Sequence, residues 1–171
     1  PDVADERLYS ETSKTLATIL AEVKRISPKP RFIVASGDLT NQGDEGSYEE
    51  LMRLFDEAEL DIPVLFALGN HDKREGFYRA VKGQTENLSA PYDHSTVIDG
   101  LHIVVLDTSA PFKVGGIFEA GQAEWLENEL NQHPELPKLL VMHHAPALDD
   151  EPSMEWESLS IADTETLRKL V

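Results

Sequence analysis

The order of its segments constrains the fold of this chain most, because short apolar runs alternate with longer stretches of helical periodicity. Apolar residues recur at three- and four-residue spacing, as on one face of a helix, over 5–27, 48–60 and 119–132. Short runs that fit buried strands occupy 31–36, 63–68 and 138–142. Strands that alternate with helices predict an α/β layered fold.

A turn signal at Asp99-Gly100 adds an antiparallel pair to this pattern. The dipeptide separates two further strand-like runs, 95–98 and 101–106, and Asp-Gly is among the strongest short-range hairpin signals. The strand arrangement is therefore predicted to be mixed rather than purely parallel. Further helices are expected over 73–82 and 163–171.

Composition limits the classes of function. The chain has 171 residues, enough for one domain, and we expect 1–171 to be a single domain. Its formal net charge of −17 disfavours nucleic-acid polymers and anionic membranes, and no apolar run approaches the ~20 residues of a membrane helix. Cysteine is absent, which excludes disulfides and permits the reducing cytoplasm that we expect as its location. A small phosphorylated substrate is compatible with this charge where bound metal ions reverse the local field.

Polar clusters follow three of the apolar runs, and ligand sites of α/β folds commonly lie beyond the carboxyl ends of strands. In the first cluster Asp38 follows Gly37, and its two carboxylate oxygens could serve two cations at once. In the second, Asn70 offers a neutral oxygen ligand and His71 offers a metal ligand or a general acid. Asp72 could orient the His71 imidazole. By itself the first cluster is better explained by an aspartate that starts a turn, and the second is as compatible with a polar turn that caps the next helix as with a functional site.

Adjacent histidines, His143 and His144, form the third cluster, and alternation along a strand points them in opposite directions, so that at most one faces a given site. Oxygen and imidazole donors without thiolates suit Mn, Fe, Co or Zn. A shared carboxylate with separate ligand sets suits two close metals, which can clamp the attacking and leaving oxygens of a phosphoryl displacement. The alternative is an α/β domain without metal, whose Asp and His residues only form turns and caps.

Taken together, the clusters resemble a known superfamily in their order and spacing. GDLT at 37–40, GNHD at 69–72 and HHAP at 143–146 look like the second, third and fourth motifs of the calcineurin-like metallophosphoesterases. A further resemblance, to the bacterial cyclic-nucleotide and glycerophosphodiester phosphodiesterase branch, lies in VVLDTS at 104–109 and in Gln122, Trp125, Leu126 and Leu130. The resemblance covers nearly the whole chain.

This resemblance implies a sandwich of two mixed β-sheets flanked by helices, with two metal ions at its active site. It implies that Asp38 bridges the metals and that Asn70 and His143 bind the second one. His71 would bind the phosphate and assist departure of the leaving group, while a metal-bound hydroxide attacks phosphorus. The expected reaction is hydrolysis of phosphodiesters, with cyclic nucleotides or glycerol-type diesters as candidate substrates. A phosphomonoesterase, or an inactive relative that binds a ligand, is the alternative, and the oligomeric state is open.

Two motifs of the superfamily are not found in this sequence, an Asp-x-His on an initial strand and a final Gly-His-x-His. We therefore expect the natural protein to extend beyond Pro1 and Val171, the sandwich to be incomplete at both ends, and this chain alone to be a poor enzyme. The protein serine/threonine phosphatases are less similar. Their second motif continues with Asp-Arg-Gly, where this chain has Asn41-Gln42-Gly43.

Overall fold

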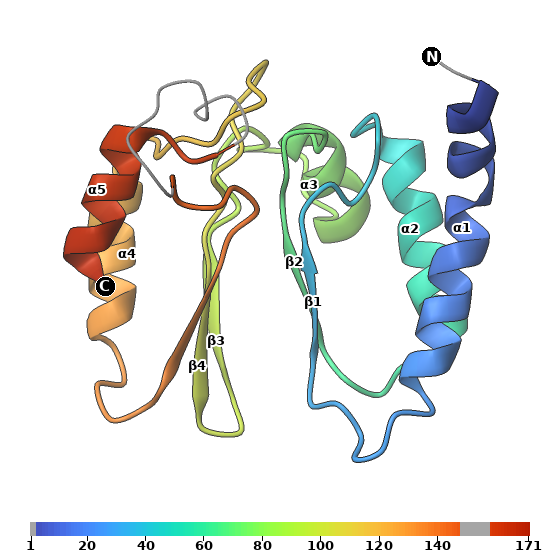
Figure 1. Cartoon of the computed structure of the whole chain (residues 1–171), viewed down its shortest axis with the longest axis horizontal. Coiled ribbons are helices and arrows are strands. Elements are labelled where there is room, and N and C mark those ends of the chain that lie inside the picture. Colours follow the sequence, from blue (N-terminus) through green and yellow to red (C-terminus); the bar gives the residue numbers. More distant parts are fainter. Residues whose placement is uncertain (1–2, 148–157) are drawn as a thin grey trace.

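Two β-sheets stand against each other in the middle of the computed structural model, which describes residues 3–147 and 158–171, and helices cover their outer faces (Figure 1). The first sheet pairs β1 (Ile33–Ser36) in parallel with β2 (Val64–Ala67). In the second sheet, β4 (Leu101–Val105) lies between β3 (His94–Ile98), to which it is antiparallel, and β5 (Lys138–Val141), to which it is parallel. The predicted hairpin at Asp99-Gly100 joins β3 to β4.

Helices cover each sheet on the side away from the other sheet (Figure 1). The first sheet carries α1 (Val3–Val23), α2 (Glu45–Ala58) and α3 (Arg74–Lys82), and the second carries α4 (Gln122–Asn131) and α5 (Ile161–Leu170). The predicted α/β class and the sandwich of two sheets flanked by helices are thus confirmed, and the mixed sheet is the second one. Within the described ranges, no helix is both long and apolar enough to cross a bilayer.

The alternation of side chains along β2 and β4 explains the layers. Leu65 and Ala67 of β2 pack between the sheets, whereas Phe66 and Leu68 face the helices of the first sheet. Likewise Ile103 and Val105 point into the space between the sheets, and their neighbours Val104 and Leu106 pack against α4 and α5. Strands that are apolar on both faces read as continuous hydrophobic runs, which is the pattern that the sequence shows.

The first helix differs from its prediction in where it ends and in which residues it buries. It ends at Val23 rather than at residue 27, and tighter three-residue turns follow, with Ile26 N–H donating to the carbonyl of Val23. Ile19 and Ile26 were expected on its apolar face but are 53% and 51% exposed, whereas Leu20 is buried. The contacts of α1 with other elements are chiefly those with α2, so only a narrow stripe of its surface meets the core.

Candidate metal centre and active site

The segments that follow β1, β2 and β5 meet at one end of the sandwich. Nε2 of His143 lies 3.5 Å from Oδ1 of Asp38. The backbone N–H of His71 donates to the same carboxylate oxygen at 3.1 Å. The second and third polar clusters therefore both reach Asp38 of the first, at the end of the sandwich where the carboxyl ends of strands from both sheets meet.

Two glycines make this close approach possible. A Cβ atom on Gly37 would lie 2.4 Å from Nδ1 of His143, and one on Gly69 would lie 2.3 Å from Oδ1 of Asp38. Gly37 has φ +105 and Asp38 has φ +51, a left-handed conformation that aspartate tolerates better than most residues. Any side chain at these two glycines would separate the imidazole from the carboxylate.

The orientation of the His143 ring is fixed by the backbone of β1. Its Nδ1 lies 2.9 Å from the carbonyl oxygen of Ser36, which can only accept, so Nδ1 carries the proton. In the neutral ring Nε2 then carries a lone pair and can only accept a hydrogen bond. It faces a carboxylate oxygen of Asp38, which likewise can only accept one. Such a pair needs a proton or a cation between its atoms, and metal ions of the zinc class bind both imidazole nitrogen and carboxylate oxygen. A backbone carbonyl on the other ring nitrogen is a usual partner of metal-binding histidines.

The residues present therefore fit a metal ion, with two firm donors and a third nearby. Asn70 lies between Gly69 and His71, both of which contact Asp38, and its side chain is half-buried with no hydrogen-bond partner in the described part of the chain. Among residues 3–147 and 158–171, no three His, Asp or Glu side chains converge as a metal site. The third ligand from this chain would thus be the amide oxygen of Asn70.

Asp72 does not contact the ring of His71, so the prediction that it orients this imidazole is wrong. Its buried carboxylate instead links the loop after β1 to the loop after β2. It accepts hydrogen bonds from the backbone N–H groups of Leu39, Thr40 and Gly69 and from the hydroxyl of Tyr48. Burial raises the pKa of Asp72, and these hydrogen bonds oppose the rise. The capping role is not realised either, because the N-cap of α3 is Lys73, whose side chain makes no capping bond.

His71 is exposed at the rim of the site. Its Nδ1 donates to the backbone carbonyl of Asn41 at 3.2 Å, which sets the ring orientation. Nε2 has no hydrogen-bond partner among the residues that the structure describes, so it is available to a bound molecule. The backbone N–H bond to Asp38 holds the residue beside the candidate ligands without making its ring one of them.

The two adjacent histidines have different surroundings, but strand alternation is not the reason, because both lie beyond the end of β5 at Val141. His143 faces Asp38, whereas the buried ring of His144 accepts a hydrogen bond from Oγ1 of Thr108 and donates one to the carbonyl of Val114, each at 2.8 Å. Burial lowers the pKa of His144, which favours this neutral ring. The ring centroids remain 4.9 Å apart and perpendicular, because both residues follow the end of β5 at Val141 and are no longer in an extended strand.

A buried ionic network beside the site was missed by the sequence reasoning. Arg74, two residues after Asp72, donates from Nε to Asp107 at 2.8 Å and from Nη1 to Glu119 at 2.7 Å, so it joins α3 to the end of β4. Asp93 adjoins this network, because its carboxylate accepts a hydrogen bond from the N–H of Asp107 at 2.8 Å, and burial raises the pKa of Asp93 to about 6. One signal was available, since Lys73 and Arg74 place cations at the N-terminal end of a helix, where the helix dipole disfavours them.

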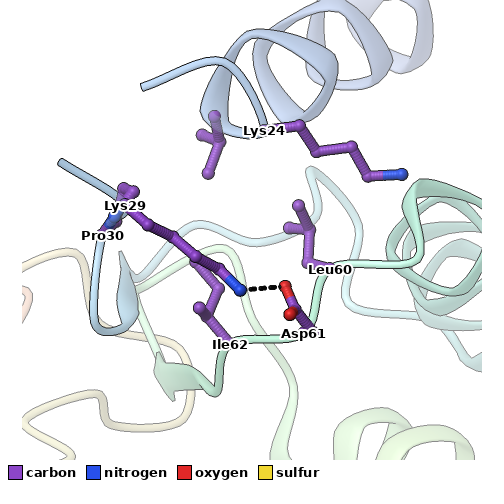
Figure 2. A pocket seen from close by; sticks show the side chains of 7 residues that line it. Lys24, Lys29, Pro30, Leu60, Asp61 and Ile62 are labelled. Carbon is purple, nitrogen blue, oxygen red and sulfur yellow. Dashed lines mark ion pairs between the residues drawn. The ribbon is translucent and has the colours of Figure 1, made fainter. Parts of the chain in front are cut away.

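A hollow of about 330 Å³ lies at the opposite end of the first sheet, near the amino ends of β1 and β2. Figure 2 shows the ion pair between Lys29 and Asp61 beside the apolar side chains of Leu60 and Ile62. Because its lining includes none of the candidate ligands, this hollow is separate from the candidate metal centre.

Comparisons with known proteins agree with the geometry. The sequence model described as calcineurin-like phosphoesterase matches residues 9–167. A probable cyclic nucleotide phosphodiesterase of Rhodococcus erythropolis is 32% identical over 84% of this chain and 49% of its own length. A cAMP/cGMP dual specificity phosphodiesterase of Mycobacterium tuberculosis is 33% identical, over 83% of this chain and 46% of its own. A probable glycerophosphodiester phosphodiesterase of Arcobacter nitrofigilis is 30% identical, over 86% of this chain and 54% of its own length. The chain thus spans about half the length of these relatives.

Proposed function

This chain belongs to the calcineurin-like phosphoesterase family, and from that premise we propose that the protein hydrolyses phosphodiesters with two metal ions, using Asp38, Asn70 and His143 as ligands. The observation that carries the proposal is the pair formed by Nε2 of His143 and the carboxylate of Asp38, two acceptors 3.5 Å apart. The printed names of the relatives, cyclic nucleotide and glycerophosphodiester phosphodiesterases, support a phosphodiester as the substrate class. Nitrogen and oxygen donors of this kind suit Mn, Fe, Zn or Co.

The metal ions, when bound, polarise phosphoryl oxygens and lower the pKa of water. The protein's own part is to hold them. Oδ1 of Asp38 is fixed by the N–H of His71 and by the approach of His143, which leaves Oδ2 available as a second donor. A carboxylate with two usable oxygens could serve both cations, and the imidazole of His143 and the amide oxygen of Asn70 would together hold the second one.

His71 is proposed to bind the substrate phosphate and to give a proton to the leaving oxygen. The carbonyl of Asn41 orients the ring through Nδ1, so that Nε2 is the nitrogen available for proton transfer.

Three donors are fewer than two metal ions require. We therefore propose that residues 1–171 form a single, partial domain that supplies only some of the metal ligands. Full activity is then expected of the natural protein with the further motifs that the family resemblance predicts. Metal binding by the chain itself is expected to be weak and centred on Asp38 and His143.

The experiment compares the natural protein with its His143→Ala variant after removal of metal by chelation and addition of Mn²⁺. We expect hydrolysis of bis(p-nitrophenyl) phosphate to exceed that of the monoester, and the variant to lose both metal and turnover. His133→Ala is the control, because its half-exposed ring pairs with Glu135 and lies outside the site. Equal metal content in His143→Ala and the starting protein would reject the proposed ligand, and preference for the monoester would reject the substrate class.

A further inference from the structure

The buried guanidinium group of Arg74 links the two halves of the sandwich. Arg74 is the first residue of α3, which covers the first sheet (Figure 1). Its Nε donates to Asp107 at 2.8 Å and its Nη2 to the carbonyl of Ser109 at 2.7 Å, both just beyond the carboxyl end of β4 in the second sheet. Nη1 donates to Glu119 at 2.7 Å and to the carbonyl of Ser89 at 2.9 Å. One side chain thus joins a helix of the first sheet to the end of a strand in the second.

On the side of the first sheet, a short path leads from Arg74 to the proposed ligands. Asp72, two residues earlier, accepts a hydrogen bond from the N–H of Leu39, which directly follows Asp38. The N–H of Asp72 donates to the carbonyl three residues earlier at 3.2 Å, which closes a turn around Asn70. A displacement of Arg74 would therefore be passed to both ligands of the first sheet.

On the side of the second sheet, the path from Arg74 ends at His143. Asp107, which receives the Nε bond, is fully buried. The next residue, Thr108, donates its hydroxyl to Nδ1 of His144 at 2.8 Å, and His144 directly follows His143. Both ends of the ion pair are therefore connected to proposed ligands, and those ligands come from different sheets.

We propose that Arg74 is a positioning residue, which sets how far His143 lies from the proposed ligands on the first sheet. The proposal rests on the proposed metal-dependent function. A buried ion pair contributes little net stability compared with apolar side chains of similar volume, because taking both charges out of water is costly. The planar fork of a guanidinium instead fixes distance and direction, because its donors point along set directions. Ligands that come from two sheets need such a fixed separation in order to share a metal centre.

Arg74→Lys in the natural protein tests this role, because it keeps the charge and loses the fork. One ammonium nitrogen cannot replace three guanidinium nitrogens that bond to Asp107, Glu119 and two carbonyls. We expect affinity for Mn²⁺, titrated after chelation, to fall roughly tenfold, as it does when the outer partners of metal ligands are replaced. At saturating Mn²⁺, kcat for bis(p-nitrophenyl) phosphate should fall roughly 10²-fold, the effect of a misplacement of about 1 Å.

Two comparisons separate positioning from simple loss of stability. Leu20→Ala is the destabilised control, because Leu20 is buried on α1, whose contacts are chiefly with α2. It should lower Tm through the cavity that it leaves and change neither Mn²⁺ affinity nor kcat. Asp107→Asn breaks the ion pair from its other side and should reproduce the losses of Arg74→Lys. The double variant should lose little more than the more impaired single variant, because both changes remove the same link.

Losses in Arg74→Lys no larger than those in Leu20→Ala, compared at equal distance below Tm, would overturn the proposal, since the ion pair would then serve the fold alone. Additive losses in the double variant would overturn it as well. A starting protein that neither binds Mn²⁺ nor hydrolyses the diester would instead reject the proposed function, and the role of Arg74 would fall with it.

Discussion

Tyr48→Phe tests how firmly the loops of the candidate site are held together. The side chain of Tyr48 is fully buried, and its hydroxyl donates to Asp72 at 2.8 Å and accepts from the N–H of Lys73 at 3.1 Å. Phenylalanine fills nearly the same space and keeps the edge-to-face contact with Phe77, so the change removes two hydrogen bonds and little packing. Losing a bond to a buried carboxylate and leaving an N–H unsatisfied should cost about 3 kcal/mol together.

Thermal and urea unfolding at neutral pH measure this loss. For a chain of this size, about 3 kcal/mol corresponds to a fall in Tm of roughly 6–12 °C. Tyr78→Phe is the matched control, because the buried Tyr78 makes a single bond to the neutral carbonyl of Pro91 at 3.2 Å, worth about 1 kcal/mol. If the two variants lost the same stability, the hydroxyl of Tyr48 would not be holding Asp72.

The same variant has a pH dependence whose sign follows from Asp72. Burial raises the pKa of Asp72, so its contribution to stability is complete below its unfolded pKa and is lost as pH rises through its folded pKa. The hydroxyl of Tyr48 stabilises the ionised carboxylate and lowers that pKa, so its removal should cost most where Asp72 is charged. The stability gap between the two proteins should therefore narrow as pH falls from 7.5 towards 4. A gap of constant size would contradict this assignment.

Three further predictions concern the site and its surroundings. Calorimetric titration with Mn²⁺ should show a large loss of affinity in His143→Ala and a smaller one in His144→Ala, and the reverse ranking would mean that the register is wrong by one residue. His71→Ala should leave metal content nearly intact and lower turnover by roughly 10²–10⁴-fold, whereas loss of metal would make it a ligand. Burial raises the pKa of Asp93 to about 6, so the stability that its protonated form provides is lost as pH rises through 6. The urea midpoint of the starting protein should therefore change more between pH 5 and pH 7 than that of Asp93→Asn.

The bounds of most helices and strands were predicted to within a few residues, because the spacing of apolar residues along the chain shows which side chains are buried. Every position of the run at 63–68 is apolar, which predicts a strand that is buried on both faces. In the structure, β2 packs Leu65 between the sheets and Phe66 against the helices. The first helix shows the limit of this reasoning. Its period shows which residues share a face, but which of them meet a neighbour depends on the packing of α2, and Ile19 stays exposed.

Site residues were harder to assign, because their partners come from distant segments. The meeting of Asp38 with His143 could be expected in part, since both follow buried strands. That β1 and β5 belong to different sheets, whose carboxyl ends meet at one end of the sandwich, was not visible in the sequence. The partners of Arg74 could not be expected, because Asp107 and Glu119 lie 33 and 45 residues away and are brought near only by the packing of the second sheet. The position of Arg74 at the start of a helix marks it as unusual, but it does not indicate which residues are its partners.

Adjacent polar residues in two of the clusters divide their roles in the same way, which the sequence alone does not reveal. In His71-Asp72 and in His143-His144, the first residue faces the candidate site, and the second is buried with its polar atoms bonded to other loops. Asp72 holds the loops after β1 and β2 together, and His144 holds the loop at 108–117. Under the proposed function, the first residue of each pair would act at the site, while the second fixes the backbone that positions it. The buried members should therefore be as intolerant of substitution as the exposed ones, through stability rather than through direct contact with metal or substrate.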